Sequence, residues 1–337
     1  MDLQGLSSSA SSVPVPPARS FVSPYPLRPL STGEVLDRCF VLYRRGFWRF
    51  VSIGMLPAAA VTFSTAGRMV YMALSHTPLV ARPQPGPGLI ANSMSQAVLL
   101  QFYFLPATVL FVLAYGLSHA ATVHAVQRAA QGVAVGGVEA YRAVGKRWLR
   151  WLGIVLRQFW SLVWPMLPVI AAVLAAFAIP GVRDSTPLSA AVSGIALLLV
   201  PASFAFGVIN FLRNALAVPA GVEEDLAVNA AMRRSRTLAA SRKGRIFLTL
   251  LLVYALQIVA GGLQLPFVWL ATTSRGLQHI AMGAAELVLA FACTALVSPV
   301  ASIALTLLYV DERVRREGYD IEVLMKQTFE TAGYSAA

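Results

Sequence analysis

The segment "LLYVDERVRREGYDIEVL", Leu307 to Leu324, changes within four residues from the end of an apolar run to one of the most densely charged stretches of the chain. This change is typical of a helix that leaves a lipid bilayer, because a charge inside hydrocarbon costs several kcal/mol. Tyr309 lies at the junction, where tyrosine suits the headgroup layer. The segment therefore predicts the end of a membrane span, with its charges marking the boundary to water and, as a second role, docking the tail onto the basic helices that precede the odd-numbered spans.

The charged part of this segment also predicts a helix that continues beyond the span. Asp311 and Arg315, like Glu312 and Arg316, have the i, i+4 spacing of ion pairs on one helix face. Gly318 is the residue type that commonly ends a helix. We expect the helix to end there.

The composition of the whole chain agrees with a membrane protein. Of its 337 residues, 57% are hydrophobic and only 12% are charged, whereas about 25% are charged in soluble proteins. The net charge of +12 would indicate nucleic acid binding in a soluble protein. In so apolar a chain it favours an anionic lipid surface, and no nucleic acid partner is expected. The two cysteines do not indicate a disulfide framework.

Six apolar runs are long enough to cross a bilayer, which requires about 20 residues in helical form. We therefore predict an all-α, polytopic bundle of six transmembrane helices. The predicted spans are Phe50–Tyr71, Ala97–Ala120, Trp151–Ile179, Leu188–Leu212, Ile246–Leu270 and Ile280–Val310.

Basic residues predict the orientation of this bundle, because positively charged flanks stay in the cytoplasm. Lys and Arg gather before the first span, between spans two and three, between spans four and five, and after span six. The other connections carry only Arg82, Arg183 and Arg275. This distribution predicts a multi-pass protein of the bacterial inner (plasma) membrane with both termini in the cytoplasm.

The chain divides into three parts on this interpretation. Residues 1–30 are rich in Ser and Pro, lack the basic start of a signal peptide, and are expected to be disordered. Residues 31–312 form the predicted six-span membrane domain. Residues 313–337 form a cytoplasmic tail that is expected to contain a short helix.

A basic amphipathic segment precedes each odd-numbered span. The three are "STGEVLDRCFVLYRRGFW", "GGVEAYRAVGKRWLRW" and "DLAVNAAMRRSRTLAASRKGR", and each has apolar residues at helical spacing on one face. In the first, Ser31 and Glu34 have the spacing of a capping box. The spans that follow begin at intervals of about a hundred residues, which predicts a threefold repeat of one interface helix and two spans.

These predicted interface helices have two interpretations. They lie in the headgroup layer, where each basic residue gains about 1 kcal/mol from anionic lipid, or they pack together as a small cytoplasmic layer whose charge only sets the topology. On the first interpretation the lipid-facing basic residues are Arg44, Arg45, Lys146, Arg147, Arg233 and Arg234.

Three cytoplasmic patches resemble one bacterial family. The stretches Arg28–Phe47, Val218–Leu238 and Leu307–Leu324 are similar to segments of the glycerophosphoryl diester phosphodiesterase membrane domain family. This resemblance implies a polytopic inner-membrane module, most of whose relatives have no known function. The family takes its name from chains in which such a module is fused to a hydrolase, and we expect no hydrolase domain here.

A search for catalytic and metal-binding motifs gives no candidate. The chain has no H-E-x-x-H, C-x-x-C, G-x-x-x-x-G-K-[ST] or G-x-S-x-G sequence. His119 and His124 are five residues apart, which places them about 140° apart around a helix. We therefore expect no metal, no cofactor and no enzymatic activity.

Two charged residues inside the spans are candidates for an ion pair. Glu286 lies within the sixth span, and Arg68 lies near the same end of the first. Because an intramembrane charge normally finds a partner or lines a cavity, we hypothesise that they pair and join the first and last spans. As alternatives, Arg68 extends to the headgroups and Glu286 is a proton or cation site.

Every predicted span contains proline, which kinks helices and also occurs in the broken helices of transporters. The polar residues of the spans, among them Gln101, Gln158, Asn210, Gln257 and Gln264, are scattered and suggest hydrogen bonds between helices. Kinked packing is therefore favoured over a transport site.

The sequence supports a first function hypothesis and two alternatives. The first is a non-enzymatic protein that organises the membrane or binds a membrane protein partner or a second copy of itself through its basic face. The second is a transporter or permease-like protein for a lipid-related or small solute, with Glu286 as a coupling carboxylate. An intramembrane lipid enzyme is the least supported.

Overall fold

The computed structural model describes residues 30–75, 89–240, 243–274 and 276–318, and every regular element in these ranges is a helix. Of the predicted disordered tail, residues 1–29 lie outside the described residues, whereas Leu30 is buried. The predicted short helix after residue 318 also lies outside them. The thirteen described helices are α1 (Thr32–Arg45), α2 (Phe47–Ser75), α3 (Leu89–Ala130), α4 (Gly137–Gly145), α5 (Trp148–Val163), α6 (Met166–Ala178), α7 (Pro180–Arg183), α8 (Thr186–Asn214), α9 (Ala217–Glu223), α10 (Val228–Ala239), α11 (Lys243–Gly262), α12 (Leu265–Thr273) and α13 (Leu277–Glu317).

The described residues contain the expected membrane spans. Five stretches, which lie in α2, α3, α8 with α9, α11 with α12, and α13, are long and apolar enough to cross a bilayer. The pair α5 and α6, bent by 48° at a short break, makes a sixth when counted as one span. The prediction of an all-α membrane bundle is confirmed.

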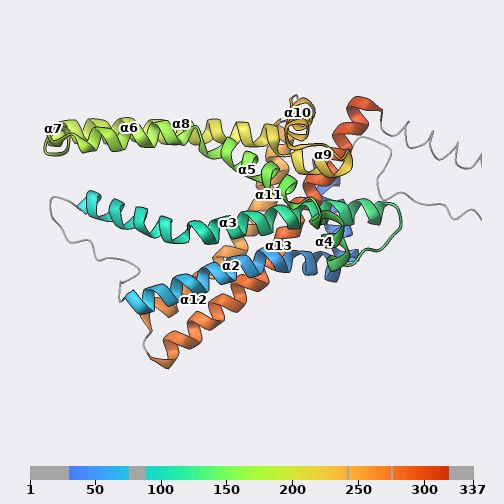
Figure 1. The fold of residues 1–337 in the computed structure, drawn as a ribbon, viewed down its shortest axis with the longest axis horizontal. Coiled ribbons are helices and arrows are strands. Elements are labelled where there is room, and N and C mark those ends of the chain that lie inside the picture. The colour runs from blue at the N-terminus through green and yellow to red at the C-terminus, as the bar shows by residue number, and fades with distance from the viewer. Residues whose placement is uncertain (1–29, 76–88, 241–242, 275, 319–337) are drawn as a thin grey trace, which may run out of the picture.

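The helices fan out from one end of the bundle (Figure 1). They come together where α4, α9 and α10 lie, and at the end that carries α7 the pair α6 and α8 lies well apart from α2 and α13. Helix α13 crosses the bundle and packs most extensively on α2. The core of buried side chains is therefore concentrated toward one end.

Small residues allow the closest helix contacts. A Cβ atom added to Gly54 of α2 would lie 2.2 Å from the carbonyl oxygen of Ala295 in α13. A Cβ added to Gly207 of α8 would lie 2.2 Å from the carbonyl oxygen of Leu162 in α5. Only glycine fits at such approaches, which are typical of helix packing in membranes.

Proline lies at the bend in the third span and at the junction of two helices in the fifth, and it leaves other helices continuous. Pro165 separates α5 from α6, and Pro266 lies in the first turn of α12. Pro57, Pro201 and Pro299 lie inside α2, α8 and α13 without ending them. The third span is therefore bent at a proline, and the preference for kinked packing over a transport site stays a prediction.

Each predicted interface helix is present, and each precedes an odd-numbered span. Helices α1, α4 and α10 lead into α2, α5 and α11. The capping box of α1 is confirmed: Ser31 N–H donates to Glu34 Oε2 at 2.7 Å, and Glu34 N–H donates to Ser31 Oγ at 3.2 Å. The short helix α9, packed between α3 and α10, was not expected from the sequence.

From Leu307 to Glu317, the described part of the charged boundary segment belongs to one continuous helix, α13, as predicted. Gly318 ends α13 in the left-handed conformation, with φ 61° and ψ 37°. Arg315 Nε lies 2.8 Å from Asp311, and Arg316 Nε lies 3.8 Å from Glu312. Asp311 and Glu312 are buried, and Arg316 and Glu317 contact α10, one of the basic amphipathic helices, as the docking interpretation expects.

Candidate functional site

Asp311 of α13 is the centre of a buried ion cluster that joins three helices. Its carboxylate accepts hydrogen bonds from the backbone N–H of Leu30 at 2.6 Å, from Arg315 at 2.8 Å and from Arg245 of α11. Arg245 also donates to the carbonyl oxygen of Leu30 at 2.7 Å. The start of α1, the start of α11 and the end of α13 are thereby held together.

Glu224, which follows α9, is the centre of a second ion cluster beside the first. Arg234 of α10 donates to Glu224 at 2.8 Å and also binds Glu317 of α13. The hydroxyl of Tyr309 donates to Glu224 as well. The hydrogen bond to Glu317 raises the pKa of Arg234 above its ordinary value.

Both ion clusters are suited to holding helices in place. Each carboxylate is already engaged by guanidinium groups, and a buried charge pair is stable only with such complete partnering. The chemistry they provide is helix docking, and a bound substrate would have to displace an arginine.

The six basic residues predicted to face lipid have different surroundings. Arg44, Arg45, Lys146 and Arg233 are exposed. Arg147, also exposed, forms an ion pair with Asp225, as does Arg150 at 2.6 Å. Arg234 is half-buried in the cluster around Glu224. The sequence did not predict these partners for Arg147 and Arg234, since they lie in distant segments of the chain. The lipid-facing role of all six basic residues stays a prediction.

Asp225 holds its position through both its backbone and its partners. Its φ of 51° is a left-handed value that aspartate tolerates better than most residues. The hydrogen bond from Arg150 lowers the pKa of Asp225 below its ordinary value, and the charge of Arg147 acts in the same direction. The turn between α9 and α10 is therefore fixed to α5.

The proposed pair of Arg68 and Glu286 stays a prediction. Glu286 is 6% exposed on α13, whereas the side chain of Arg68 lies outside the described residues. A Cβ added to Gly283 would lie 3.7 Å from the sulfur of Met69. The residue next to Arg68 and the turn of α13 before Glu286 therefore lie side by side.

A cavity of about 470 Å³ lies between six helices at the converging end of the bundle. Ligand pockets commonly enclose about 300–1,000 Å³, so it has room for a small ligand or part of a lipid. The described residues that line it come from α2, α3, α5, α8, α11 and α13. They are Pro57, Phe111, Tyr115, His119, Gln158, Phe159, Leu162, Phe204, Val208, Phe211, Leu212, Ala215, Phe247, Leu250, Leu251, Tyr254, Gln257, Thr294, Ser298, Ala301 and Leu305.

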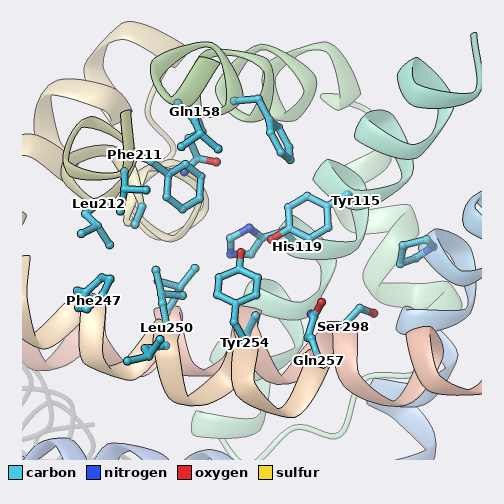
Figure 2. Close-up of a pocket in the computed structure, with 18 of the residues that line it drawn as sticks. Tyr115, His119, Gln158, Phe211, Leu212, Phe247, Leu250, Tyr254, Gln257 and Ser298 are labelled. Carbon is cyan, nitrogen blue, oxygen red and sulfur yellow. The ribbon is translucent and has the colours of Figure 1, made fainter. Parts of the chain in front are cut away.

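Polar side chains lie on one side of this cavity. His119 and Tyr115 project from α3, and the ring of Tyr254 extends toward them from α11 (Figure 2). Ser298 of α13 and Gln257 of α11 lie beside this group. Sequence analysis missed the grouping, because these residues are far apart in the chain and only packing brings them together.

The other side of the cavity is mostly apolar, with Gln158 as its polar residue (Figure 2). Phe211 and Leu212 of α8 face Phe247 and Leu250 of α11 across it (Figure 2). The cavity is therefore amphipathic along its length, which suits a ligand with a hydrocarbon chain and a polar group.

The scattered polar residues of the spans have three different roles. Gln158 donates to the carbonyl oxygen of Asn214 at 2.7 Å, which confirms one expected bond between helices. Asn210 donates to a carbonyl oxygen of its own helix, and Gln264, in the turn after α11, donates to the carbonyl oxygen of Ala260 in α11. Gln257 lines the cavity, as does Gln158. The side chain of Gln101 lies outside the described residues.

Within the described ranges, no group of three or more His, Cys, Asp or Glu side chains is arranged to hold a metal ion. His119 lines the cavity, and His279 Nδ1 lies 2.6 Å from the carbonyl oxygen of Ala271. His76 lies outside the described residues.

Comparisons with known proteins do not place the chain in a family. The chain matches no protein-family model, no curated protein and no solved structure. The resemblance to the glycerophosphoryl diester phosphodiesterase membrane domain family therefore stays a prediction.

Proposed function

We propose that this protein is a non-enzymatic integral membrane protein that binds a lipid in its intramembrane cavity and organises the membrane around it. The observation that carries the proposal is the cavity of about 470 Å³, which is lined mostly by apolar and aromatic side chains and lies between six helices. In a membrane, the molecules available to fill such a space are lipids, because their chains are the surrounding solvent.

The basic helices fit this function. Arg44, Arg45 and Lys146 are exposed near the end of the bundle that carries α4. Basic residues at a membrane surface attract anionic headgroups by about 1 kcal/mol each. We propose that this face lies on the cytoplasmic side of a bacterial inner membrane, with both termini on the same side, and that anionic lipid, a membrane protein or a second copy of the chain contacts it.

The proposal is tested by filling the mouth of the cavity. Leu251 lines the cavity and is 50% exposed, so tryptophan at this position has room to fold over the opening. The protein would be purified in mild detergent, and the copurified lipid per protein molecule measured by mass spectrometry of extracts. We expect Leu251→Trp to reduce the bound lipid at least about threefold, because tryptophan occupies space that the chain needs.

Leu252 provides the matched control. It is the next residue of α11, is 46% exposed and does not line the cavity. Leu252→Trp should keep the bound lipid of the unaltered protein. If Leu251→Trp and Leu252→Trp retain equal amounts of lipid, or if the unaltered protein carries none, the cavity is not a lipid site.

Transport is the second candidate function, and the burial of Glu286 favours it. A carboxylate at 6% exposure inside a span is expensive and is common in ion-coupled transporters. Glu286 is not among the described residues that line the cavity, so we place transport second. With expression intact, Glu286→Gln should leave a lipid-binding protein active and should abolish proton-coupled transport.

A further inference from the structure

The polar side of the cavity indicates what kind of lipid it accepts, an inference that rests on the proposed function. His119 is 2% exposed, and neither of its ring nitrogens has a hydrogen-bond partner among the described residues. A neutral imidazole has one N–H donor and one acceptor nitrogen. Leaving both unpaired in an apolar interior is costly, so a ligand that satisfies them gains affinity.

Ser298 gives a second, independent indication. Its hydroxyl is buried on α13, lines the same cavity and also lacks a hydrogen-bond partner in the described part of the chain. Tyr254 extends from α11 toward the same region as His119 (Figure 2). Hydrogen-bonding groups from three helices therefore line one largely apolar cavity.

The lack of charged side chains in the described lining restricts the charge of the ligand. The described residues that line the cavity include no Asp, Glu, Lys or Arg. A charged group buried there would have no counterion, and burying an unpaired charge is far more costly than burying a neutral polar group that is hydrogen-bonded. The part of the ligand inside the cavity is therefore uncharged.

We propose that the cavity selects an uncharged, hydroxyl-bearing lipid, whose hydroxyl forms hydrogen bonds with His119 and Ser298 while its chain lies between α8 and α11. A hydroxyl both donates and accepts hydrogen bonds, which matches the unpaired groups of these two side chains. A phosphate or carboxylate headgroup does not fit this side of the cavity.

The test compares three probes of equal chain length: oleyl alcohol, oleyl phosphate and 1-octadecene. Their apparent affinities would be measured from the rise in thermal unfolding temperature of the detergent-purified protein across a concentration series. We expect oleyl alcohol to bind roughly tenfold more tightly than 1-octadecene, the contribution of one or two hydrogen bonds. Oleyl phosphate should bind more weakly than oleyl alcohol.

Variants of the polar lining residues test which side chains cause the preference for oleyl alcohol over 1-octadecene. His119→Phe keeps an aromatic ring and removes both nitrogens, so oleyl alcohol should lose most of its advantage over 1-octadecene. His124→Phe is the matched control, because His124 is on the same helix and does not line the cavity. It should keep the full preference. Ser298→Ala is a smaller change that should reduce the preference about threefold and serves if His119→Phe does not fold.

The outcomes separate this inference from the proposed function. If none of the three probes binds the unaltered protein, the proposed function fails. If oleyl alcohol and 1-octadecene bind equally well, or if oleyl phosphate binds as tightly as the alcohol, the cavity binds lipid without the proposed selectivity and this inference alone is overturned.

Discussion

The two ends of the helix bundle differ in what holds them together. At the end where α9 and α10 lie, residues 299–312 of α13 are all buried, and the carboxylates of Asp311 and Glu224 are bound by arginines of other helices. At the other end, α6 has no buried residue, and in α8 only Gly207, Leu212 and Asn214 are buried.

This difference suggests that the two ends of the bundle are stabilised in different ways. Buried ion clusters have a defined geometry because each charge needs its partner. Apolar surface facing lipid has no such requirement, since lipid chains are as apolar as the side chains. The ion clusters at the converging end therefore fix the arrangement of the helices. At the end that carries α7, lipid covers the apolar surface of the helices. The cavity lies beside the ion clusters, which maintain its shape.

The largest expected effect comes from breaking the ion cluster around Asp311. Asp311→Ala leaves Arg245 buried without its main partner, which typically costs about 3–5 kcal/mol of unfolding free energy. We expect a much lower thermal unfolding temperature and less folded protein in detergent. The control is Asp184→Ala, because Asp184 pairs with Arg183 at an exposed site, where a pair contributes at most about 1 kcal/mol. If Asp311→Ala and Asp184→Ala lowered the unfolding temperature equally, the ion clusters would not be what stabilises the converging end.

A smaller effect is expected from two glycines of α8. Gly207→Ala places a methyl group against the carbonyl oxygen of Leu162 and should destabilise the protein by about 1–3 kcal/mol. Gly194→Ala has no neighbour within 4 Å and should be neutral or stabilise the helix by up to about 1 kcal/mol. Thermal unfolding temperatures of the two variants compare a packed and an exposed position of one helix. Destabilisation by Gly194→Ala would contradict this account.

The smallest effect on stability is expected at Asp225, which lies on the exposed surface of the converging end. Its pKa is lower in the folded protein than the ordinary value of 3.8, mainly because Arg150 donates a hydrogen bond to it. Its ion pairs therefore contribute stability above about pH 3.8 and lose it as the pH falls through the folded pKa. Asp225→Asn should unfold at a slightly lower temperature than the unaltered protein at pH 7, and the difference should shrink below pH 3.8. A difference that grows in acid would contradict this account.

The sequence predicted the structural features that depend on residues close together in the chain. The spans follow from runs of apolar residues, the start of α1 from Ser31 and Glu34, and the end of α13 from Gly318. The pairs of Asp311 with Arg315 and of Glu312 with Arg316 follow from one turn of helix.

The sequence did not predict what depends on contacts between distant segments. Arg245 meets Asp311 across 66 positions, and Arg234 meets Glu317 across 83. The cavity likewise arises where His119 and Ser298 approach from different helices. Proline gave a partial signal. It occurs in every predicted span, whereas Pro57, Pro201 and Pro299 lie inside continuous helices and Pro165 and Pro266 lie where one described helix ends and the next begins.

The most direct test of the account is a cryo-EM map of the chain in lipid nanodiscs, with a bound antibody fragment to add mass. The account predicts elongated density inside the cavity, running between α8 and α11 and ending in hydrogen-bonding contact with His119. A cavity closed by its own side chains, with lipid density only on the outer surface of the helices, would contradict it.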